Sequence, residues 1–346
     1  MSDDQLTYRD SGVDIGGAER TLRSVLPSIQ ATYNENVVAG VGGFGGLYRA
    51  DFGNLQRPVL VSSIDGVGTK TKVAAMVGDF SGLGADIVNH SVNDILCQGA
   101  KPLFFLDYFA TSRLDPAVFV QVIESAAKAC AENGMVLLGG ETAEMPGVYH
   151  DEEIDLVGAV VGVVDYERRL PRGKILPGDT VIGIASVGLH TNGFSLARVA
   201  LFEHGSLSVR DRVPGLESTI GEELLRPHRC YYNSVYPILQ EAEGIRGIAH
   251  ITGGGLHGNL PRAMHPNVQA VIDRRSWQPL PIFKLIQESG RISDHEMFSA
   301  FNMGIGMVLV VSKDSASAVV RMLTEAGEAA AAIGYIQTGA HDVQIV

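Results

Sequence analysis

The chain has 346 residues, more than a single compact core usually supports, so two domains are expected. Its content of 45% hydrophobic and 19% charged residues is typical of a globular protein and excludes a disordered one. A formal net charge of −12 at pH 7, with no basic patch, argues against nucleic acid or an anionic membrane surface as a partner.

The N-terminus and the cysteines indicate the compartment. The first ten residues, MSDDQLTYRD, lack the basic and apolar segments of a signal peptide, and the longest apolar run, residues 156–164, is too short to span a membrane. Cys97, Cys130 and Cys230 lie far apart without metal-type spacing, as is typical of free thiols in a reducing environment. We therefore expect a cytoplasmic protein.

A predicted helix over residues 18–33 precedes a glycine-rich segment, GVGGFGG, at residues 40–46. The segment formally contains G-x-G-x-x-G, but a short alternating strand at residues 47–51 follows instead of the helix that a dinucleotide fold requires. We expect Gly42, Gly43, Gly45 and Gly46 to form a flexible loop that covers phosphates. A plain hairpin turn is the alternative.

Residues 58–70, PVLVSSIDGVGTK, form an apolar strand that ends at Asp65 and breaks into a glycine turn. A carboxylate there suits Mg²⁺, while the backbone amides near Gly66 and Gly68 suit phosphoryl oxygens. Thr69 adds a hydroxyl and Lys70 a mobile positive charge. The segment therefore predicts a site for a metal-bound polyphosphate, although an ordinary strand and surface turn is the alternative.

Residues 86–99 have the period of a helix whose second face carries only short polar side chains, at Asp86, Asn89, His90, Asn93 and Asp94. Asn and Asp disfavour helix interiors and are rare on a merely solvated face, where Lys, Glu, Arg and Gln predominate. The stripe therefore indicates a ligand-facing surface, with a wet face as the alternative.

Two further strands carry acidic residues in or after them. Residues 102–111 are strongly apolar but contain Asp107, which is costly to bury unpaired and should face a polar cleft. A helix capped by Asp115 and begun by Pro116 follows, and then a strand at residues 135–138 runs into glycines and Glu141. Residues 156–164 complete this half as a buried strand.

A polar segment with prolines and glycines at residues 165–178 marks the domain boundary, giving domains 1–168 and 169–346. In the second half, strands are expected at residues 180–185, 248–251, 268–272, 305–311, 333–336 and 343–346, and helices at 193–204, 228–243, 281–288 and 313–326. Both halves are thus mixed α and β, an α+β fold of two domains.

Three separated carboxylates, Asp65, Asp94 and Glu141, are the expected Mg²⁺ ligands. One Mg²⁺ usually takes one or two carboxylates together with phosphate oxygens and water, so this set could hold more than one ion along a triphosphate. The chain has neither a Walker sequence nor the H-R-D and D-F-G motifs of protein kinases. A nucleotide site of another kind is therefore expected.

Eight motifs along nearly the whole chain together resemble the aminoimidazole ribonucleotide synthetase family. They are GVDI at residues 12–15, GGFGG at 42–46, DGVGTK at 65–70, ND at 93–94, GAKPLFFLDY at 99–108, GGETAEMPG at 139–147, HTNG at 190–193 and HITGGG at 250–255. Thr71, where an aliphatic residue is expected, is the one departure noticed. The wider superfamily, with thiamine-phosphate kinase, selenophosphate synthetase and formylglycinamidine synthetase, shares a looser acidic site.

The resemblance implies ATP- and Mg²⁺-dependent ring closure of formylglycinamidine ribonucleotide through an iminophosphate. It implies a homodimer whose N-terminal sheets pair into a barrel, with the second domain packed outside. Asp65, Asp94 and Glu141 would bind Mg²⁺, with Asp107 a weaker candidate for the nucleotide site, and Lys70 and the glycine loop would hold ATP phosphates. The residues expected to face the substrate are His190, Thr191, Asn192, Ser195, Gly253, Gly254 and Gly255.

Two choices stay open. His190 is either a general base or a structural histidine. The function is either that of the cyclo-ligase, that of a kinase of the same superfamily, or that of a non-catalytic nucleotide-binding regulator, which would bind ATP without consuming it.

Overall fold

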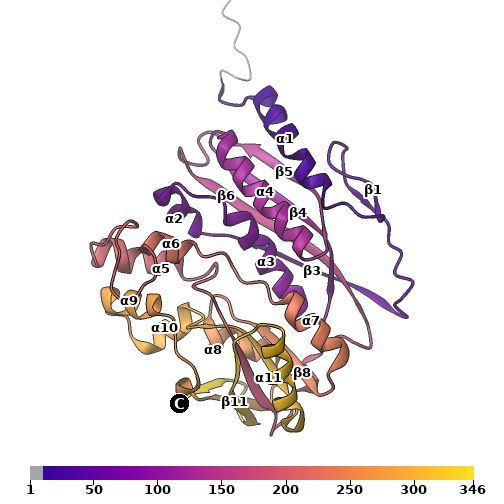
Figure 1. Cartoon of the computed structure of the whole chain (residues 1–346), viewed down its shortest axis with the longest axis vertical. Coiled ribbons are helices and arrows are strands. Elements are labelled where there is room, and N and C mark those ends of the chain that lie inside the picture. Colours follow the sequence, from indigo (N-terminus) through magenta and orange to yellow (C-terminus); the bar gives the residue numbers. More distant parts are fainter. Residues whose placement is uncertain (1–10) are drawn as a thin grey trace, which may run out of the picture.

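The computed structural model describes residues 11–346, so the N-terminal MSDDQLTYRD segment lies outside the described part. Within residues 11–346 the chain forms two domains, each built on one β-sheet, with the first above the second in Figure 1. No helix of these residues is long and apolar enough to cross a bilayer.

The first domain has a four-stranded sheet in the order β3-β6-β4-β5. Its strands are β3 (Pro58–Gly66), β4 (Lys101–Thr111), β5 (Val136–Glu144) and β6 (Ile154–Asp165). Its helices are α1 (Ile15–Gln30), α2 (Lys70–Val77), α3 (Leu83–Leu96) and α4 (Pro116–Glu132). Helices α1, α4 and α3 lie side by side across one face of the sheet (Figure 1). Within residues 11–346, no helix packs on the other face.

The second domain has a six-stranded sheet in the order β12-β9-β11-β7-β10-β8. Its strands are β7 (Thr180–Ala185), β8 (Ile245–His250), β9 (Val268–Ile272), β10 (Ile305–Val311), β11 (Ala330–Thr338) and β12 (Val343–Ile345). Its helices are α5 (Phe194–Arg198), α6 (Ile220–Leu225), α7 (Tyr232–Glu241), α8 (Gly255–Asn259), α9 (Pro281–Gly290), α10 (Asp294–Ala300) and α11 (Ala316–Glu325).

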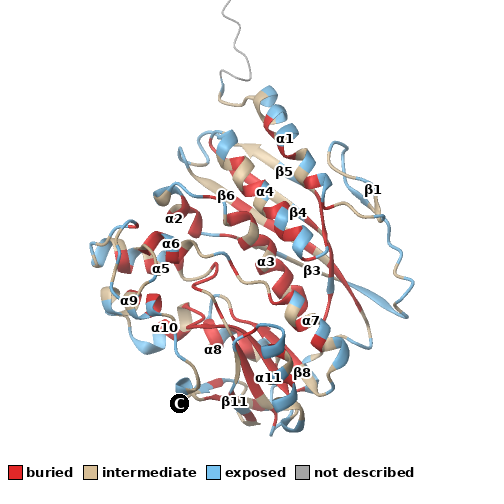
Figure 2. Ribbon diagram, viewed as in Figure 1, coloured by how far each residue is buried: buried red, intermediate tan, exposed pale blue. Residues whose placement is uncertain are grey.

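One hydrophobic core joins the domains. It contains Val92 and Ile95 of α3 together with Ile182 of β7 and Met307 of β10, all of them buried. Alternate residues of β7 and β10, such as Val181 and Val308, face a separate core on the other side of that sheet, as the two-residue period of strands requires. Figure 2 shows buried residues running through α3 and α4 and into the second sheet. The domains are therefore packed together rather than loosely tethered.

Strongly patterned elements lie where the sequence predicts them. Strands β7, β9 and β10 have the predicted bounds, and α4 begins after its Asp115 cap, whose carboxylate accepts from the Ala117 N–H. The short helices α2, α6, α8 and α10 were not predicted, because five to eight residues carry too little periodicity. All three cysteines are free thiols, as expected.

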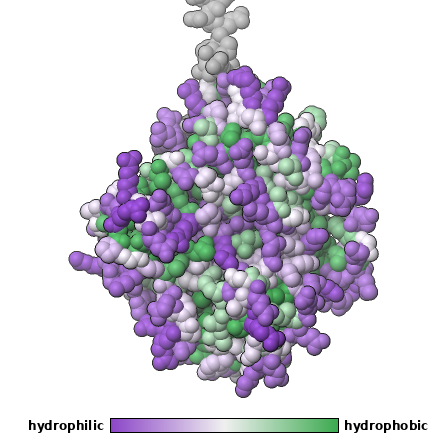
Figure 3. Space-filling view, viewed as in Figure 1, coloured by the Kyte–Doolittle hydropathy of each residue, from purple (hydrophilic) through white to green (hydrophobic). Residues whose placement is uncertain are grey.

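The expected phosphate-covering loop at residues 42–46 is the connection of a hairpin between β1 (Val37–Ala39) and β2 (Leu47–Tyr48). This hairpin exposes Val38, Leu47 and the fully exposed Phe44. On the face shown in Figure 3, hydrophilic side chains predominate, and a hydrophobic group lies at the edge near β1.

Candidate active site

The polar stripe of α3 is used mainly to dock the second domain. Asn89 donates to the His228 carbonyl (2.8 Å) and Asn93 to the Arg229 carbonyl (2.8 Å), while Asn93 Oδ1 accepts from the Tyr231 N–H (2.9 Å). The expectation of a wholly ligand-facing stripe is therefore wrong for these two asparagines. Their short amides satisfy a backbone segment that has no secondary-structure partner of its own.

Lys70 is also part of this docking. Its ammonium is fully buried and donates to Asp86 Oδ1 (2.8 Å), the Arg226 carbonyl (2.8 Å) and the His190 carbonyl (3.2 Å). These bonds engage all three donors of the ammonium group. The expectation of a mobile charge that binds phosphate is thus corrected: Lys70 fastens α2 to the second domain.

Asp65 and Asp94, by contrast, do come together, at the end of β3 and on α3. His90 Nε2 lies 3.0 Å from Asp65 Oδ2 and 3.8 Å from Asp94 Oδ2. Asp94 Oδ1 is 2.8 Å from His250 Nδ1, and its Oδ2 accepts from the Ser63 hydroxyl (3.0 Å). Side-chain exposures of 44% for Asp65 and 29% for Asp94 leave both carboxylates open to a ligand.

The surroundings of these carboxylates keep both of them ionised. Burial alone would raise the pKa of Asp65, but the hydrogen bond and charge of His90 outweigh it and the pKa is lowered. The pKa of Asp94 is also lowered, because the contacts with His250 and His90 outweigh the effect of burial. Burial likewise opposes the charged form of His90, yet Asp65 and Asp94 raise its pKa. The surroundings thus favour a positively charged His90 between the ionised carboxylates of Asp65 and Asp94.

Four histidines from four segments meet behind the carboxylates. His90 Nδ1 lies 2.7 Å from the Thr191 hydroxyl, and His228 Nε2 lies 2.9 Å from His250 Nε2. The ring of His190 stacks on that of His228 with centroids 4.1 Å apart. In the sequence, His90 is marked only by its place in the α3 stripe and His250 only by the HITGGG motif, and no motif contains His228. No local signal joins them, because His190, His228 and His250 come from separate segments of the second domain and His90 meets them only when the domains dock.

His190 is enclosed rather than open to a substrate. It is buried, has φ +64° and leaves its Nδ1 without a hydrogen-bond partner among the described residues. Burial lowers its pKa well below the ordinary value, so the ring is neutral. Of the two readings, the structure favours a structural histidine over a general base in direct contact with substrate.

Two of the other predicted substrate-side residues, Thr191 and Ser195, contact the first domain, and the glycines pack within the second. The Ser195 hydroxyl is 2.9 Å from that of Thr69, which joins the turn after β3 to α5. Gly253 lies so close to Asn192 that an added Cβ would be 3.1 Å from Asn192 Oδ1. Gly254 and Gly255 have positive φ, and a Cβ on Gly255 would collide with the Phe298 carbonyl, so glycine is required there for packing.

Glu141 and Asp107 lie away from Asp65. Across the sheet, Asp65 pairs with Gly158, Gly158 with Asp107, and Asp107 with Gly140. Glu141 is therefore three strands from Asp65, about 14 Å at ordinary strand spacing, too far for a shared ion. The expected set of three carboxylates is not brought together within the chain.

Asp107 instead lines a cavity of about 360 Å³ that lies between α1, α4 and the first sheet. Burial raises the pKa of its carboxyl to about 7. The glycine-rich segment reaches this cavity, since Val41 lines it.

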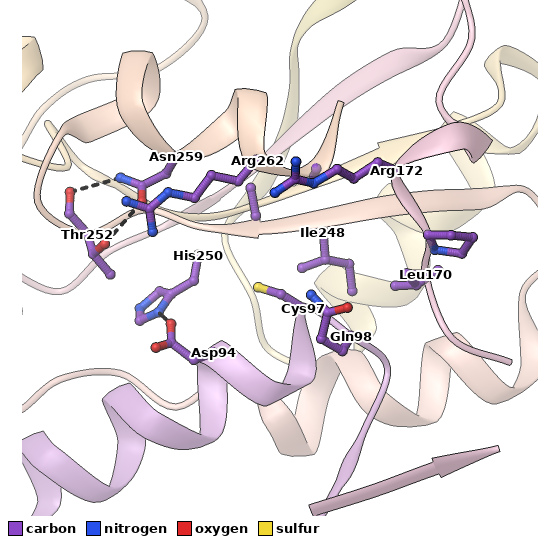
Figure 4. A pocket seen from close by; sticks show the side chains of 13 residues that line it. Asp94, Cys97, Gln98, Leu170, Arg172, Ile248, His250, Thr252, Asn259 and Arg262 are labelled. Atoms are coloured by element: carbon purple, nitrogen blue, oxygen red, sulfur yellow. Dashed lines mark hydrogen bonds and ion pairs between the residues drawn. The ribbon is translucent and has the colours of Figure 1, made fainter. Parts of the chain in front are cut away.

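A pocket of about 390 Å³ opens beside Asp94 and His250, between α3 and the second sheet. Figure 4 shows Asp94 and His250 pointing toward each other, with Arg172 and Arg262 along the opposite side. The pocket thus has acidic and imidazole groups at one end and guanidinium groups at the other, which suits an anionic ligand bound beside a cation. Neither arginine was predicted, because nothing in the sequence marks an isolated arginine as a ligand.

The two domains match those of AIR synthase related proteins. The model of the N-terminal domain of AIR synthase related proteins matches residues 51–164, and that of their C-terminal domain matches residues 177–346. Solved structures with this fold include thiamine-monophosphate kinase from Stenotrophomonas maltophilia K279a, with 14% identity, TM-score 0.65 and coverage of 93% of this chain and 95% of that one. Hydrogenase maturation protein HypE in complex with ATP is another, with 18% identity, TM-score 0.63 and coverage of 97% and 92%.

Full-length relatives then define the family. Phosphoribosylformylglycinamidine cyclo-ligase from Geotalea uraniireducens (strain Rf4) is 44% identical, with 100% of both chains covered. The enzyme of that name from Syntrophus aciditrophicus (strain SB) is 47% identical, with 96% of both chains covered. The chain belongs to the phosphoribosylformylglycinamidine cyclo-ligase family, and it is accordingly an enzyme of the ligase class.

Proposed function

We propose that the chain catalyses ATP-dependent ring closure of formylglycinamidine ribonucleotide, giving 5-aminoimidazole ribonucleotide, ADP and phosphate in purine biosynthesis. The observation that carries this proposal is the meeting of Asp65 and Asp94 at the domain interface, next to the pocket that Asp94 shares with Arg172 and Arg262. The carboxylates suit a metal-bound phosphoryl group, and the arginines suit the phosphate of a ribonucleotide.

Asp65 and Asp94 fit Mg²⁺, because both present partly exposed, ionised oxygen ligands beside the same His90 nitrogen. Bound Mg²⁺ would neutralise phosphoryl charge as the group is transferred. Helix α2 begins at Lys70, directly after the DGVGT turn, so its positive dipole end adds to the site for phosphate beside Gly66, Gly68 and Thr69. Glu141 and Asp107 remain candidates for a second ion or another part of the nucleotide.

The chemistry needs positioning more than covalent help. Transfer of the phosphoryl group to the formamide oxygen makes an iminophosphate, so that this oxygen leaves as phosphate when the amidine nitrogen of the same molecule attacks the carbon. Thr191 and Ser195 lie at the interface, with Asn192 and Gly253 packed against each other beside Thr191 in the second domain, and this group could orient the substrate. In this mechanism Lys70 and His190 maintain the docked geometry and do not touch the reacting atoms.

The uncovered face of the first sheet supports the proposal of a homodimer. Leu60 and Ile64 of β3 are 62% and 70% exposed, and Leu106 of β4 is 38% exposed. Their neighbours Ser63 and Asp65 point instead toward α3, as strand alternation requires. An apolar sheet face of this kind fits pairing with the sheet of a second copy into a barrel.

The test is turnover with ATP, Mg²⁺ and formylglycinamidine ribonucleotide, assayed by the aromatic amine of the imidazole product. Substrate labelled with ¹⁸O in the formamide group should deliver its label to inorganic phosphate, one atom for each imidazole formed. A kinase would leave a stable phosphorylated product, and a regulator would bind ATP without consuming it. Imidazole formation with unlabelled phosphate would contradict the iminophosphate route.

A further inference from the structure

Two imidazole nitrogens stand beside the two carboxylates at the domain interface. His90 Nε2 is 3.0 Å from Asp65 Oδ2 and 3.8 Å from Asp94 Oδ2, and His250 Nδ1 is 2.8 Å from Asp94 Oδ1. His90, Asp94 and His250 each place one ligand atom within 4.8 Å of the others. Ligand atoms about 2.0–2.2 Å from one ion lie ~3 to 3.5 Å apart, so small side-chain movements would bring this set around a cation.

The far nitrogen of each imidazole already has a partner. When His90 Nε2 and His250 Nδ1 turn their lone pairs to an ion, the hydrogens reside on His90 Nδ1 and His250 Nε2. His90 Nδ1 then donates to the Thr191 hydroxyl (2.7 Å), and His250 Nε2 donates to His228 Nε2 (2.9 Å). Metal-binding histidines are oriented in this way by hydrogen bonds from their second ring nitrogen.

A competing set of three histidines fits less well. His190, His228 and His250 also place ligand atoms within 4.8 Å, and all three are buried. The rings of His190 and His228 are stacked, with 27° between their planes, so their in-plane lone pairs do not converge easily on one ion. This set also lacks a carboxylate to offset the charge of a divalent cation.

We propose that His90, Asp94 and His250, together with Asp65, bind a divalent transition-metal ion such as Mn²⁺, Co²⁺ or Zn²⁺. Imidazole ligands favour these ions, whereas Mg²⁺ prefers oxygen ligands and water. The inference rests on the proposed function only in that Asp65 and Asp94 are the residues expected to hold Mg²⁺. It names the ion that this chain prefers at that point, with or without nucleotide.

The experiment is titration of the full-length, EDTA-treated protein with Co²⁺, without ATP, followed by the visible absorption of cobalt bound to nitrogen and oxygen ligands. One equivalent should saturate the band, and Mn²⁺ or Zn²⁺ should displace it at concentrations at least ten times lower than Mg²⁺. His90→Gln should weaken binding by about 10- to 100-fold, the usual effect of losing a ligand or its support. His265→Gln, at an exposed turn far from the site in sequence, is the matched control and should bind as the unchanged chain does.

Asp65→Asn serves as a second variant if His90→Gln fails to fold, which circular dichroism and thermal unfolding would show. The absence of a cobalt band in the unchanged chain would overturn the proposal. So would folded His90→Gln and Asp65→Asn variants that bind Co²⁺ with the same affinity as the unchanged chain. So would loss of binding in His265→Gln. Cobalt binding without imidazole formation would support the metal site and contradict the proposed function. Imidazole formation without cobalt binding would support the proposed function and contradict the metal site.

Discussion

His250 Nδ1 lies 2.8 Å from Asp94 Oδ1, so the end of β8 in the second domain holds a carboxylate on α3 of the first. The same helix receives the backbone of residues 228–231 through Asn89 and Asn93. The first domain contributes Asp65, His90 and Asp94 to the acidic site, and docking of the second domain adds His250. The contact between Asp94 and His250 therefore exists only in the docked protein.

Asp94→Asn is expected to reduce turnover by several orders of magnitude while leaving the fold intact. The amide keeps the size of the side chain but removes the charge on which metal-assisted phosphoryl transfer depends. Asp65→Asn should behave alike. Steady-state rates of imidazole formation at saturating Mg²⁺, with circular dichroism as the fold control, check this. Near-normal rates in both variants would remove the two carboxylates from the reaction.

Lys70→Met is expected to act on stability. It leaves Asp86 buried without its cation, which typically costs about 3–5 kcal/mol. The double variant Lys70→Met/Asp86→Asn should recover part of that loss, and a double-mutant cycle measured by urea unfolding gives the coupling. Lys284→Met, at an exposed helix position, is the matched control and should change stability by less than about 0.5 kcal/mol. Unchanged stability with weakened ATP binding would restore the phosphate-binding role.

Asp107 makes stability depend on pH. Burial raises the pKa of its carboxyl to about 7 from the ordinary 3.8. Below about pH 7 this half-buried carboxyl stays protonated in the folded state while it ionises in the unfolded state, so its contribution to stability is lost between about pH 4 and pH 7. Asp107→Asn, which cannot ionise, should therefore unfold at a higher temperature than the unchanged chain at pH 8, and this advantage should shrink toward pH 5.

Asp165→Asn is the control of opposite sign. The exposed Asp165 carboxylate accepts backbone N–H groups of Glu167, Gln56 and Arg57, and these bonds lower its pKa. Its stabilising contribution is present above the ordinary pKa and is lost as pH falls, so this substitution should destabilise the protein at pH 8. Equal temperature shifts for both variants at pH 8 would contradict the account of Asp107.

The sequence predicts what depends on local pattern and fails where distant segments meet. The α3 stripe was correctly expected to be more than a wet face, because short amides and carboxylates disfavour helices without a partner. The sequence could not show that Asn89 and Asn93 serve the backbone while Asp94 faces a pocket. Glu141 belongs to a motif as distinctive as that of Asp65, yet strand order separates the two, and His250, not Glu141, lies beside Asp94. Strand order depends on long-range pairing, which a single sequence does not reveal.

The exposed sheet face gives the last prediction. Leu60 of β3 and Leu106 of β4 are exposed apolar residues on a sheet face that no helix of the described chain covers. If two copies pair through this face, Leu60→Glu and Leu106→Glu would place charges in an apolar interface, where they are costly to bury without a partner. Light scattering after size exclusion should show a dimer for the unchanged chain and a shift toward monomer for both variants.

Leu176→Glu provides the matched control for this prediction, because Leu176 is an exposed leucine of the second domain, before β7. Its substitution adds the same charge and should leave the dimer unchanged. A dimer that persists in both sheet variants, or one that is lost in Leu176→Glu, would place the interface elsewhere. A monomeric unchanged chain at micromolar concentration would rule out the barrel of two sheets, because an apolar face of this kind would then remain open to water.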